Sequence, residues 1–170
     1  MRFALSQEQR QFSASVSDML GSADTPSAAR AWGEGEHEPG LRIWRQLAEL
    51  GLTALAVGQE HGGLDAEPVD LVVALEQCGY HAVCGPLVEA LAVVPILLRN
   101  LADDDLAAQW LPRLAAGEAL ATIALPPHVP YALDADIADL VLAGNADGAL
   151  QRLDGGGIPP QRSVDVVRRL

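Results

Sequence analysis

Lysine is absent from this 170-residue chain, so arginine supplies all 11 basic residues against 23 aspartates and glutamates. The formal net charge of −12 repels a phosphate backbone and argues against nucleic acid as a partner. Long apolar runs are lacking as well: the longest, residues 90–98, contains Pro95 and is far too short to span a membrane. No basic-then-apolar leader opens the chain. We therefore expect a soluble cytoplasmic protein with no membrane partner.

Residues that bind metals or act as nucleophiles are also few. Cys78 and Cys84 are the only cysteines, and nothing about them demands a disulfide. With His81 they could in principle bind zinc, but positions three apart spread around a helix, and cysteine is commonly a buried small hydrophobe. The three aspartates within residues 134–139 could bind a hard cation, but turn capping and solvation explain them better. We therefore expect no metal site. The sequence also shows no nucleophile paired with a base, so it identifies no catalytic residue.

The first helix has a clear start signal. Ser6 and Gln9 have the capping-box spacing, and apolar residues then recur on one helical face as far as Gly21. Residues 22–40 are polar and rich in glycine and proline, which predicts a loop with one short helical turn at residues 28–32.

Three more helices follow from apolar spacing and from glycine and proline positions. One covers residues 41–50 and ends at Gly51, where a left-handed C-cap is needed. The next covers residues 68–79. The third covers residues 85–98, and we expect Pro95 to kink it without ending it.

The apolar period changes near residue 118. Residues 120–125 alternate in a β-compatible run, and residues 140–142 and 150–153 flank a Gly/Asn-rich turn typical of a β-hairpin. We therefore expect an all-α domain over residues 1–117 and a β segment over residues 118–170.

Three ordered motifs resemble the N-terminal helical domain of the flavin-dependent acyl-CoA dehydrogenases. Residues 47–63 read LAELGLTALAVGQEHGG, similar to the family's "laelGl…vPeeyGG". Phe3 with residues 5–9 resembles the family's opening helix, and residues 110–118 resemble its "wLp.l..Ge" signature. The resemblance implies an α+β fold: an N-terminal all-α helical domain of acyl-CoA dehydrogenase type, followed by an incomplete antiparallel β segment, the shortened start of the middle β domain.

The same resemblance implies a function in fatty acid or lipid metabolism. Family members use flavin adenine dinucleotide (FAD) to desaturate an acyl-CoA thioester to a 2-enoyl-CoA, and they form homo- or heterotetramers. Their catalytic glutamate lies in a C-terminal helical bundle, so no catalytic residue is named in this chain. The leading hypothesis is a subunit or portion of such an FAD-dependent oxidoreductase, inactive by itself, with acyl-CoA and a homologous subunit as partners.

One departure from the family supports an alternative. Where the family has "a-l-T-E-P…G-S-D" beside the flavin, this chain reads Ala124-Leu125-Pro126-Pro127, so its FAD-binding residues are unknown. The loop that follows residue 125 is shorter than the family's, and in this it resembles the same loop in the smaller subunits of heteromeric members. The alternative is therefore a non-catalytic assembly subunit that has lost flavin-site chemistry. A weaker third hypothesis is a free-standing helical interaction module.

The resemblance also points to a substrate pocket. Val83, Leu87 and Leu91 match the helix that forms the pocket floor in the family, and their four-residue spacing places them on one stripe of a helix. Plain core packing is the alternative, since any buried helix shows an apolar stripe.

Overall fold

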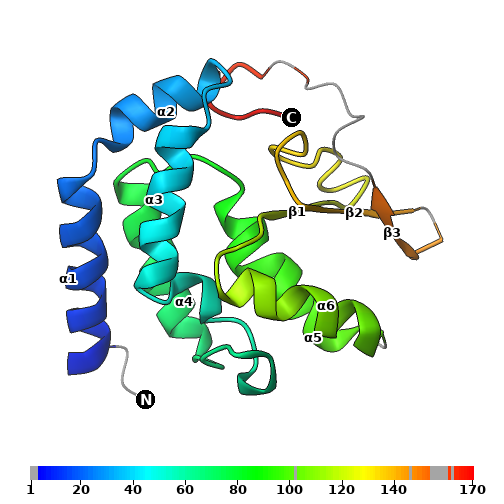
Figure 1. The fold of residues 1–170 in the computed structure, drawn as a ribbon, viewed down its shortest axis with the longest axis horizontal. Helices are drawn as coiled ribbons and strands as arrows, with labels where there is room; N and C mark the ends of the chain where they lie inside the picture. Colours follow the sequence, from blue (N-terminus) through cyan, green and yellow to red (C-terminus); the bar gives the residue numbers. More distant parts are fainter. Residues whose placement is uncertain (1–3, 102, 146, 154–160, 162) are drawn as a thin grey trace.

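Helices come first along the chain and a small sheet follows (Figure 1). The computed structural model describes residues 4–101, 103–145, 147–153, 161 and 163–170, so Phe3 of the opening motif lies outside the described residues. The α-helices are α1 (Gln7–Ser22), α2 (Thr25–Gly33), α3 (Glu38–Glu49), α4 (Pro68–Tyr80), α5 (Val94–Asn100) and α6 (Asp104–Ala115). Two short 3₁₀ helices, η1 (Leu52–Ala54) and η2 (Gln59–His61), and a π-helical turn, η3 (Glu89–Val93), connect them. The strands are β1 (Ala121–Ala124), β2 (Leu140–Gly144) and β3 (Leu150–Leu153). The expected fold class, a helical domain followed by a small β segment, is confirmed.

Helix α1 begins with the capping box that the sequence predicts. The Ser6 hydroxyl accepts from the Gln9 amide at 3.1 Å, and the Gln9 side chain accepts from the Ser6 amide at 2.9 Å. Two of the amides that a helix start leaves without partners are thereby satisfied.

The prediction of a loop over residues 22–40 is wrong, because most of this stretch is helical, although the helical turn expected at residues 28–32 does lie within α2. The Asp24 side chain caps α2 by accepting from the Ser27 amide at 3.1 Å. Pro26 and Pro39 lie in the first turns of α2 and α3, where a missing amide costs nothing. The prolines that suggested a loop therefore mark the starts of two helices.

A close contact between α3 and the turn after α6 joins the two halves of the chain. Trp44 Nε1 donates to the Gly117 carbonyl at 3.0 Å, and Thr53 Oγ1 donates to the Ala115 carbonyl at 2.7 Å. Gly117 has φ +70°, and a Cβ added there would lie 2.3 Å from the Cβ of Ala48. Only glycine allows the backbone of this turn to approach α3 so closely.

The helix predicted through Pro95 does continue past it. The π-helical turn η3 precedes α5, and Pro95 lies in the first turn of α5. Proline has no amide to donate, and its ring crowds the carbonyl four residues earlier. The wider π-helical turn before Pro95 relieves this steric clash without ending the helix.

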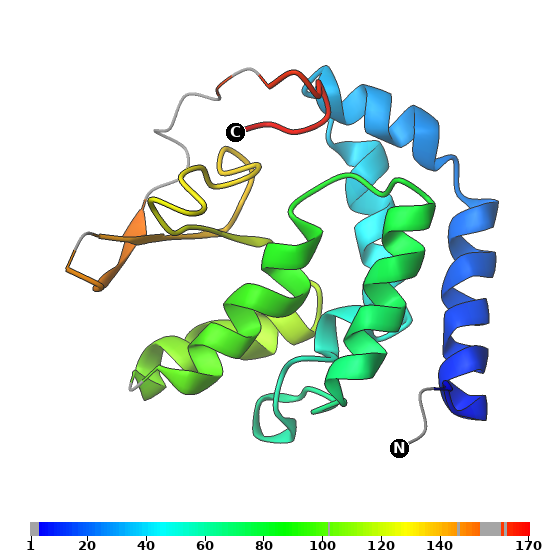
Figure 2. The ribbon, with the colours of Figure 1, turned by 180° about the vertical axis from the view of Figure 1, so that it is seen from behind.

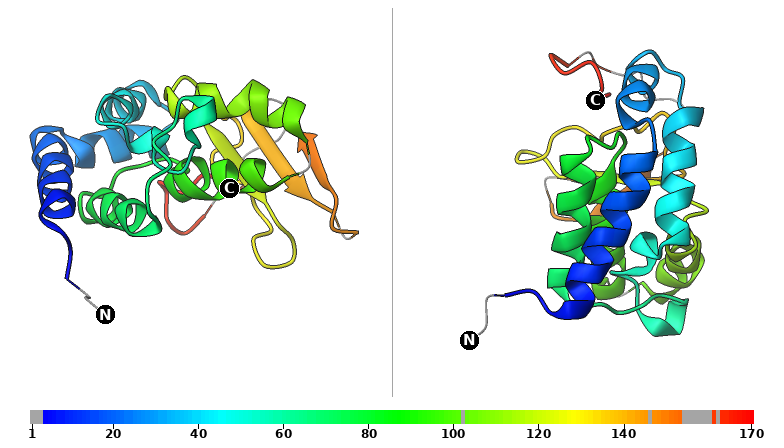
Figure 3. Two further views of the ribbon diagram at one scale, coloured as in Figure 1. Left: turned by 90° about the horizontal axis from the view of Figure 1, so that it is seen from below. Right: turned by 90° about the vertical axis from the view of Figure 1, so that its left-hand side faces the viewer.

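The buried side chains form two clusters. One joins α1, α3 and α4 and includes Leu20, Leu47 and Leu91. The other joins α5 and α6 to the sheet and includes Leu98, Leu111 and Leu140. Figures 2 and 3 show α1 and α4 side by side, with β3 at the far side of the molecule from α1. Among the described helices, none combines the length and apolar character that a membrane span requires.

The sheet has the order β1-β2-β3. β2 and β3 form the predicted antiparallel hairpin, and the Asn145 side chain accepts from the Ala149 amide at 2.8 Å to hold its turn. β1, in contrast, runs parallel to β2, because a long connection lies between them, so the segment is mixed and not wholly antiparallel. In the described part of the chain, no strand pairs with the outer edge of β3.

Two arginines cover the ring of Trp110, which is 2% exposed. The guanidinium of Arg113 in α6 lies 4.7 Å from the ring centroid, and that of Arg152 in β3 lies 5.1 Å from it. These cation–π contacts connect the edge strand to α6.

Replacement of Gly117 by alanine tests the close contact with α3. Gly117→Ala must clash with Ala48 at a positive φ, and we expect it to lower the free energy of unfolding by about 3 kcal/mol in urea denaturation. Gly148→Ala is the matched control, because Gly148 also has positive φ (+80°) but open space around its Cβ position. We expect a loss of about 1 kcal/mol there. Equal losses for the two variants would contradict the role of the contact.

Candidate functional site

A groove of about 490 Å³ lies between α2, the connection from α4 to η3, and two segments from the end of the chain. Its apolar lining consists of Ala29, Ala82, Val83, Cys84, Gly85, Leu87, Val88, Leu133 and Val167. Its charged lining consists of Glu89, Asp134, Asp165 and Arg168. A concave, mainly apolar site with a few polar groups is the usual form of a small-molecule site.

The structure brings two of the three predicted pocket residues to this groove. Val83 and Leu87 line it, whereas Leu91 is fully buried in the cluster between α1, α3 and α4. The difference is one of depth, because Val83 and Leu87 are partly buried and pack against the cluster that contains Leu91. Whether these residues contact an acyl group stays a prediction.

Val88 is a groove residue that sequence reasoning missed. Its side chain is 52% exposed although it is apolar, and it lies directly beside Leu87 in the sequence. An exposed valine has no sequence signal that separates it from a core valine, so only the structure identifies it.

Asp134 forms the polar end of the groove, and it is 2% exposed. Its Oδ1 accepts from Trp32 Nε1 at 2.8 Å, and its amide donates to the Arg169 carbonyl at 2.8 Å. Trp32 and Asp134 are 102 residues apart in the sequence, so no local pattern could have paired them. Asp134 lies in a turn, as expected, but the expectation that it is solvated is wrong, because its side chain is buried.

The segment 163–170 packs against this polar end. The Arg169 guanidinium pairs with the Asp136 carboxylate, and both side chains are mostly buried. His37 packs edge-on against Trp32 with ring centroids 4.8 Å apart. Burial, followed by the nearby Arg169, lowers the pKa of His37, so its imidazole is neutral at pH 7. One wall of the groove is therefore tied to α2 by the hydrogen bond from Trp32 to Asp134, and the Asp136–Arg169 pair lies beside it.

Burial is the largest cause of the raised pKa values of two groove residues, Asp134 and Cys84. It raises the pKa of Asp134 to about 6; the Trp32 hydrogen bond and Arg169 oppose the rise, while Asp136 and Glu89 add to it. Burial also raises the pKa of the Cys84 thiol to about 11, so this groove thiol is protonated and a poor nucleophile or metal ligand.

The other candidate metal ligands have structural partners. His81 Nε2 lies 3.2 Å from the Ser17 hydroxyl, and burial raises the pKa of Cys78 to about 11. Asp139 Oδ2 accepts from the Leu120 amide at 2.9 Å, which holds the start of β1 beside β2. Within the described residues, no cluster of three or more His, Cys, Asp or Glu side chains could hold a metal ion.

Comparison with known proteins identifies relatives of this chain. The family model for the acyl-CoA dehydrogenase N-terminal domain matches residues 6–118. Acyl-CoA dehydrogenase IpdE2 of Mycobacterium tuberculosis is 30% identical over 165 residues, and IpdE2 of Mycolicibacterium smegmatis is 29% identical over 171. These matches cover 96% and 98% of this chain but 50% and 51% of the relatives, so the chain spans about half their length.

Solved structures show the same fold at low identity. The ChsE4–ChsE5 complex of Mycobacterium tuberculosis matches with a TM-score of 0.74 at 18% identity, over 95% of this chain and 51% of that one. A glutaryl-CoA dehydrogenase of Mycobacterium smegmatis in complex with FADH2 matches with a TM-score of 0.71 at 16% identity, over 97% and 51%.

Replacement of Asp134 by asparagine tests the cost of its buried charge. The folded-state pKa of about 6 exceeds the ordinary value of 3.8, so the fold holds this proton more tightly than the unfolded chain does. Stability is therefore lost as the pH rises from about 4 to about 6, and it stays lost above that range. Asparagine keeps an oxygen for Trp32 without the charge. We expect Asp134→Asn to raise the free energy of unfolding by about 2 kcal/mol at about pH 8, and to change it little at about pH 4.

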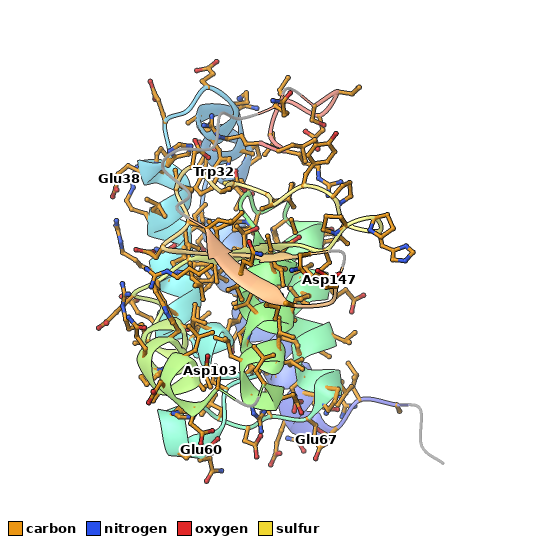
Figure 4. The ribbon with its side chains drawn as sticks, turned by 90° about the vertical axis from the view of Figure 1, so that its right-hand side faces the viewer. Trp32, Glu38, Glu60, Glu67, Asp103 and Asp147 are labelled. Atoms are coloured by element: carbon orange, nitrogen blue, oxygen red, sulfur yellow. The ribbon has the colours of Figure 1, made fainter. Side chains whose placement is uncertain are left out.

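The control for this prediction is Asp147→Asn, in the exposed hairpin turn, for which we expect no pH-dependent gain (Figure 4). Urea denaturation of the three proteins at both pH values gives the measurement. A loss of stability in Asp134→Asn at about pH 8 would show that the charged form is the one that the fold requires.

Proposed function

The chain belongs to the acyl-CoA dehydrogenase family, and from this membership we propose that it is a subunit, or a portion of one, of an FAD-dependent acyl-CoA dehydrogenase. The proposed reaction is the α,β-desaturation of an acyl-CoA thioester to a 2-enoyl-CoA in lipid metabolism, in the cytoplasm. The match of the N-terminal domain over residues 6–118 carries the proposal. We propose residues 1–117 as that domain and residues 118–170 as the start of the middle β domain.

The groove is the proposed site for the acyl group. Its wall of Val83, Leu87 and Val88 can remove an apolar chain from water, which favours binding by roughly 0.8 kcal/mol for each buried CH₂ group. The proposed task of this chain is therefore to bind and desolvate the substrate. Leu91 supports the groove from the core behind it.

The loop after β1 does not fit a flavin. Pro126 and Pro127 have no amide to donate, and Leu125 and Val129 close the loop by hydrogen bonds of 2.6 and 2.9 Å to each other. We therefore propose that FAD is held chiefly by other parts of the assembly, and that this chain alone is inactive. Two structural neighbours were solved with FAD or FADH2, which supports the cofactor assignment at the level of the family.

A non-catalytic assembly subunit is the second candidate function, and the poor fit of this loop favours it. The unpaired outer edge of β3 offers backbone donors and acceptors to further strands, in the described part of the chain. The partner in either case is a homologous chain in a homo- or heterotetramer, and the two-component ChsE4–ChsE5 neighbour supports a heteromeric arrangement.

Co-purification distinguishes the two candidates. We expect the tagged chain, expressed in its natural host, to recover a longer homologous chain, and the complex to contain flavin measurable by its absorbance. Full flavin occupancy of every site would exclude the assembly subunit. A complex that contains no flavin, and that does not reduce an electron acceptor with acyl-CoA, would exclude the dehydrogenase.

Alanine variants test the groove as the acyl site. We expect Leu87→Ala to weaken acyl-CoA binding about fivefold, because it removes apolar contact area. Leu91→Ala should instead lower the free energy of unfolding by about 3 kcal/mol, since Leu91 is a core residue. Val72→Ala, at a 62% exposed position on α4, is the control and should change neither. Unchanged calorimetric binding in Leu87→Ala would show that the acyl group lies elsewhere.

A further inference from the structure

The charges that line the groove are unequal. Three acidic residues line it, Glu89, Asp134 and Asp165, against one arginine, Arg168. The next charges outward, Asp136 and Arg169, pair with each other and so add little net field. The groove therefore has an excess of negative charge beside an apolar wall.

The buried position of Asp134 increases the effect of this excess. Water can screen the exposed Asp165 and Arg168, but it screens a 2% exposed carboxyl poorly. Glu89 is close enough to Asp134 to disfavour its ionisation. A third negative group brought by a ligand would meet both of them in a partly dehydrated space, where Arg168 is the one lining cation against three acidic residues.

Carboxylates also determine which polar groups the groove can accept. An ionised carboxylate only accepts hydrogen bonds, so a ligand hydroxyl that donates a proton finds partners here. Hydrogen bonds to charged acceptors are stronger than those between neutral groups. A ligand that offers only acceptors finds one guanidinium, on the exposed side chain of Arg168.

We propose that the groove selects a neutral, mainly apolar acyl group that carries a hydroxyl, and that it discriminates against acyl groups that end in a carboxylate. The observation that carries this proposal is the set of three acids against one arginine along the groove. The inference rests on the proposed function, because it assumes that the groove holds the acyl part of a CoA thioester.

Three thioesters of equal acyl length test the proposal: hexanoyl-, ω-hydroxyhexanoyl- and adipoyl-CoA. They share the charged CoA moiety and differ only at the end of the acyl chain. Isothermal titration calorimetry with the full 170-residue chain, near neutral pH and at low salt, measures their affinities. We expect the hydroxyl-ended probe to bind at least as tightly as hexanoyl-CoA, and adipoyl-CoA to bind about tenfold more weakly.

Two variants that remove charges of opposite sign test whether the groove causes the weaker binding of adipoyl-CoA. Glu89→Gln should reduce the disadvantage of adipoyl-CoA about threefold, and Arg168→Gln should increase it about threefold. Glu60→Gln is the matched control, because Glu60 lies at the opposite end of the molecule from Trp32 (Figure 4). It should leave the ratio of affinities unchanged.

The outcomes separate this inference from the proposed function. If the three probes bind equally, or if adipoyl-CoA binds best, acyl-CoA recognition stands and the charge selection is overturned. If none of them binds, or if Leu87→Ala does not weaken their binding, the groove is not the acyl site and the inference fails, while the co-purification and flavin measurement still decide the proposed function. An affinity ratio that shifts equally in Glu60→Gln would also overturn the charge selection.

Discussion

The buried hydrogen bond from Trp32 to Asp134 is the contact on which the arrangement of the groove depends. It joins α2 to a segment 102 residues later, and the amide of Asp134 in turn holds the carbonyl of Arg169. Three parts of the chain that are distant in sequence thus meet at one residue, Asp134. The cost is a carboxyl group out of water, whose pKa burial raises to about 6. These joined segments supply the wall of the groove that lies across from the α4–η3 connection.

Local signals in the sequence predict the helices and strands well where their chemistry is local. The Ser6–Gln9 capping box and the left-handed Gly51 are examples, because the partner of each residue lies within one turn. The error at residues 22–40 has a local cause too. Pro26 and Pro39 can start a helix as readily as they can interrupt one, and composition does not distinguish the two cases. The parallel pairing of β1 and β2 depends on a connection that carries no register signal.

The site was predictable only in part, for a different reason. The apolar stripe identified Val83 and Leu87, which line the groove. Leu91 lies in the core cluster against which those two residues pack, and a stripe alone does not separate a groove wall from the core behind it. The burial of Asp134 could not be predicted, because it follows from the meeting of α2 with the chain's last segment. Apolar periodicity thus locates a groove wall, whereas the charged end of a groove depends on long-range contacts.

Each tryptophan of this chain lies at a different junction, so the protein carries three built-in optical probes. Trp32 reports on the contact of α2 with Asp134, Trp44 on the contact of α3 with Gly117, and Trp110 on the packing of α6 against the sheet. All three indoles are nearly excluded from water, so opening of any one junction shifts the emission of one residue towards the red. Single-tryptophan versions of the chain would therefore resolve, in time, which junction separates first as the fold comes apart.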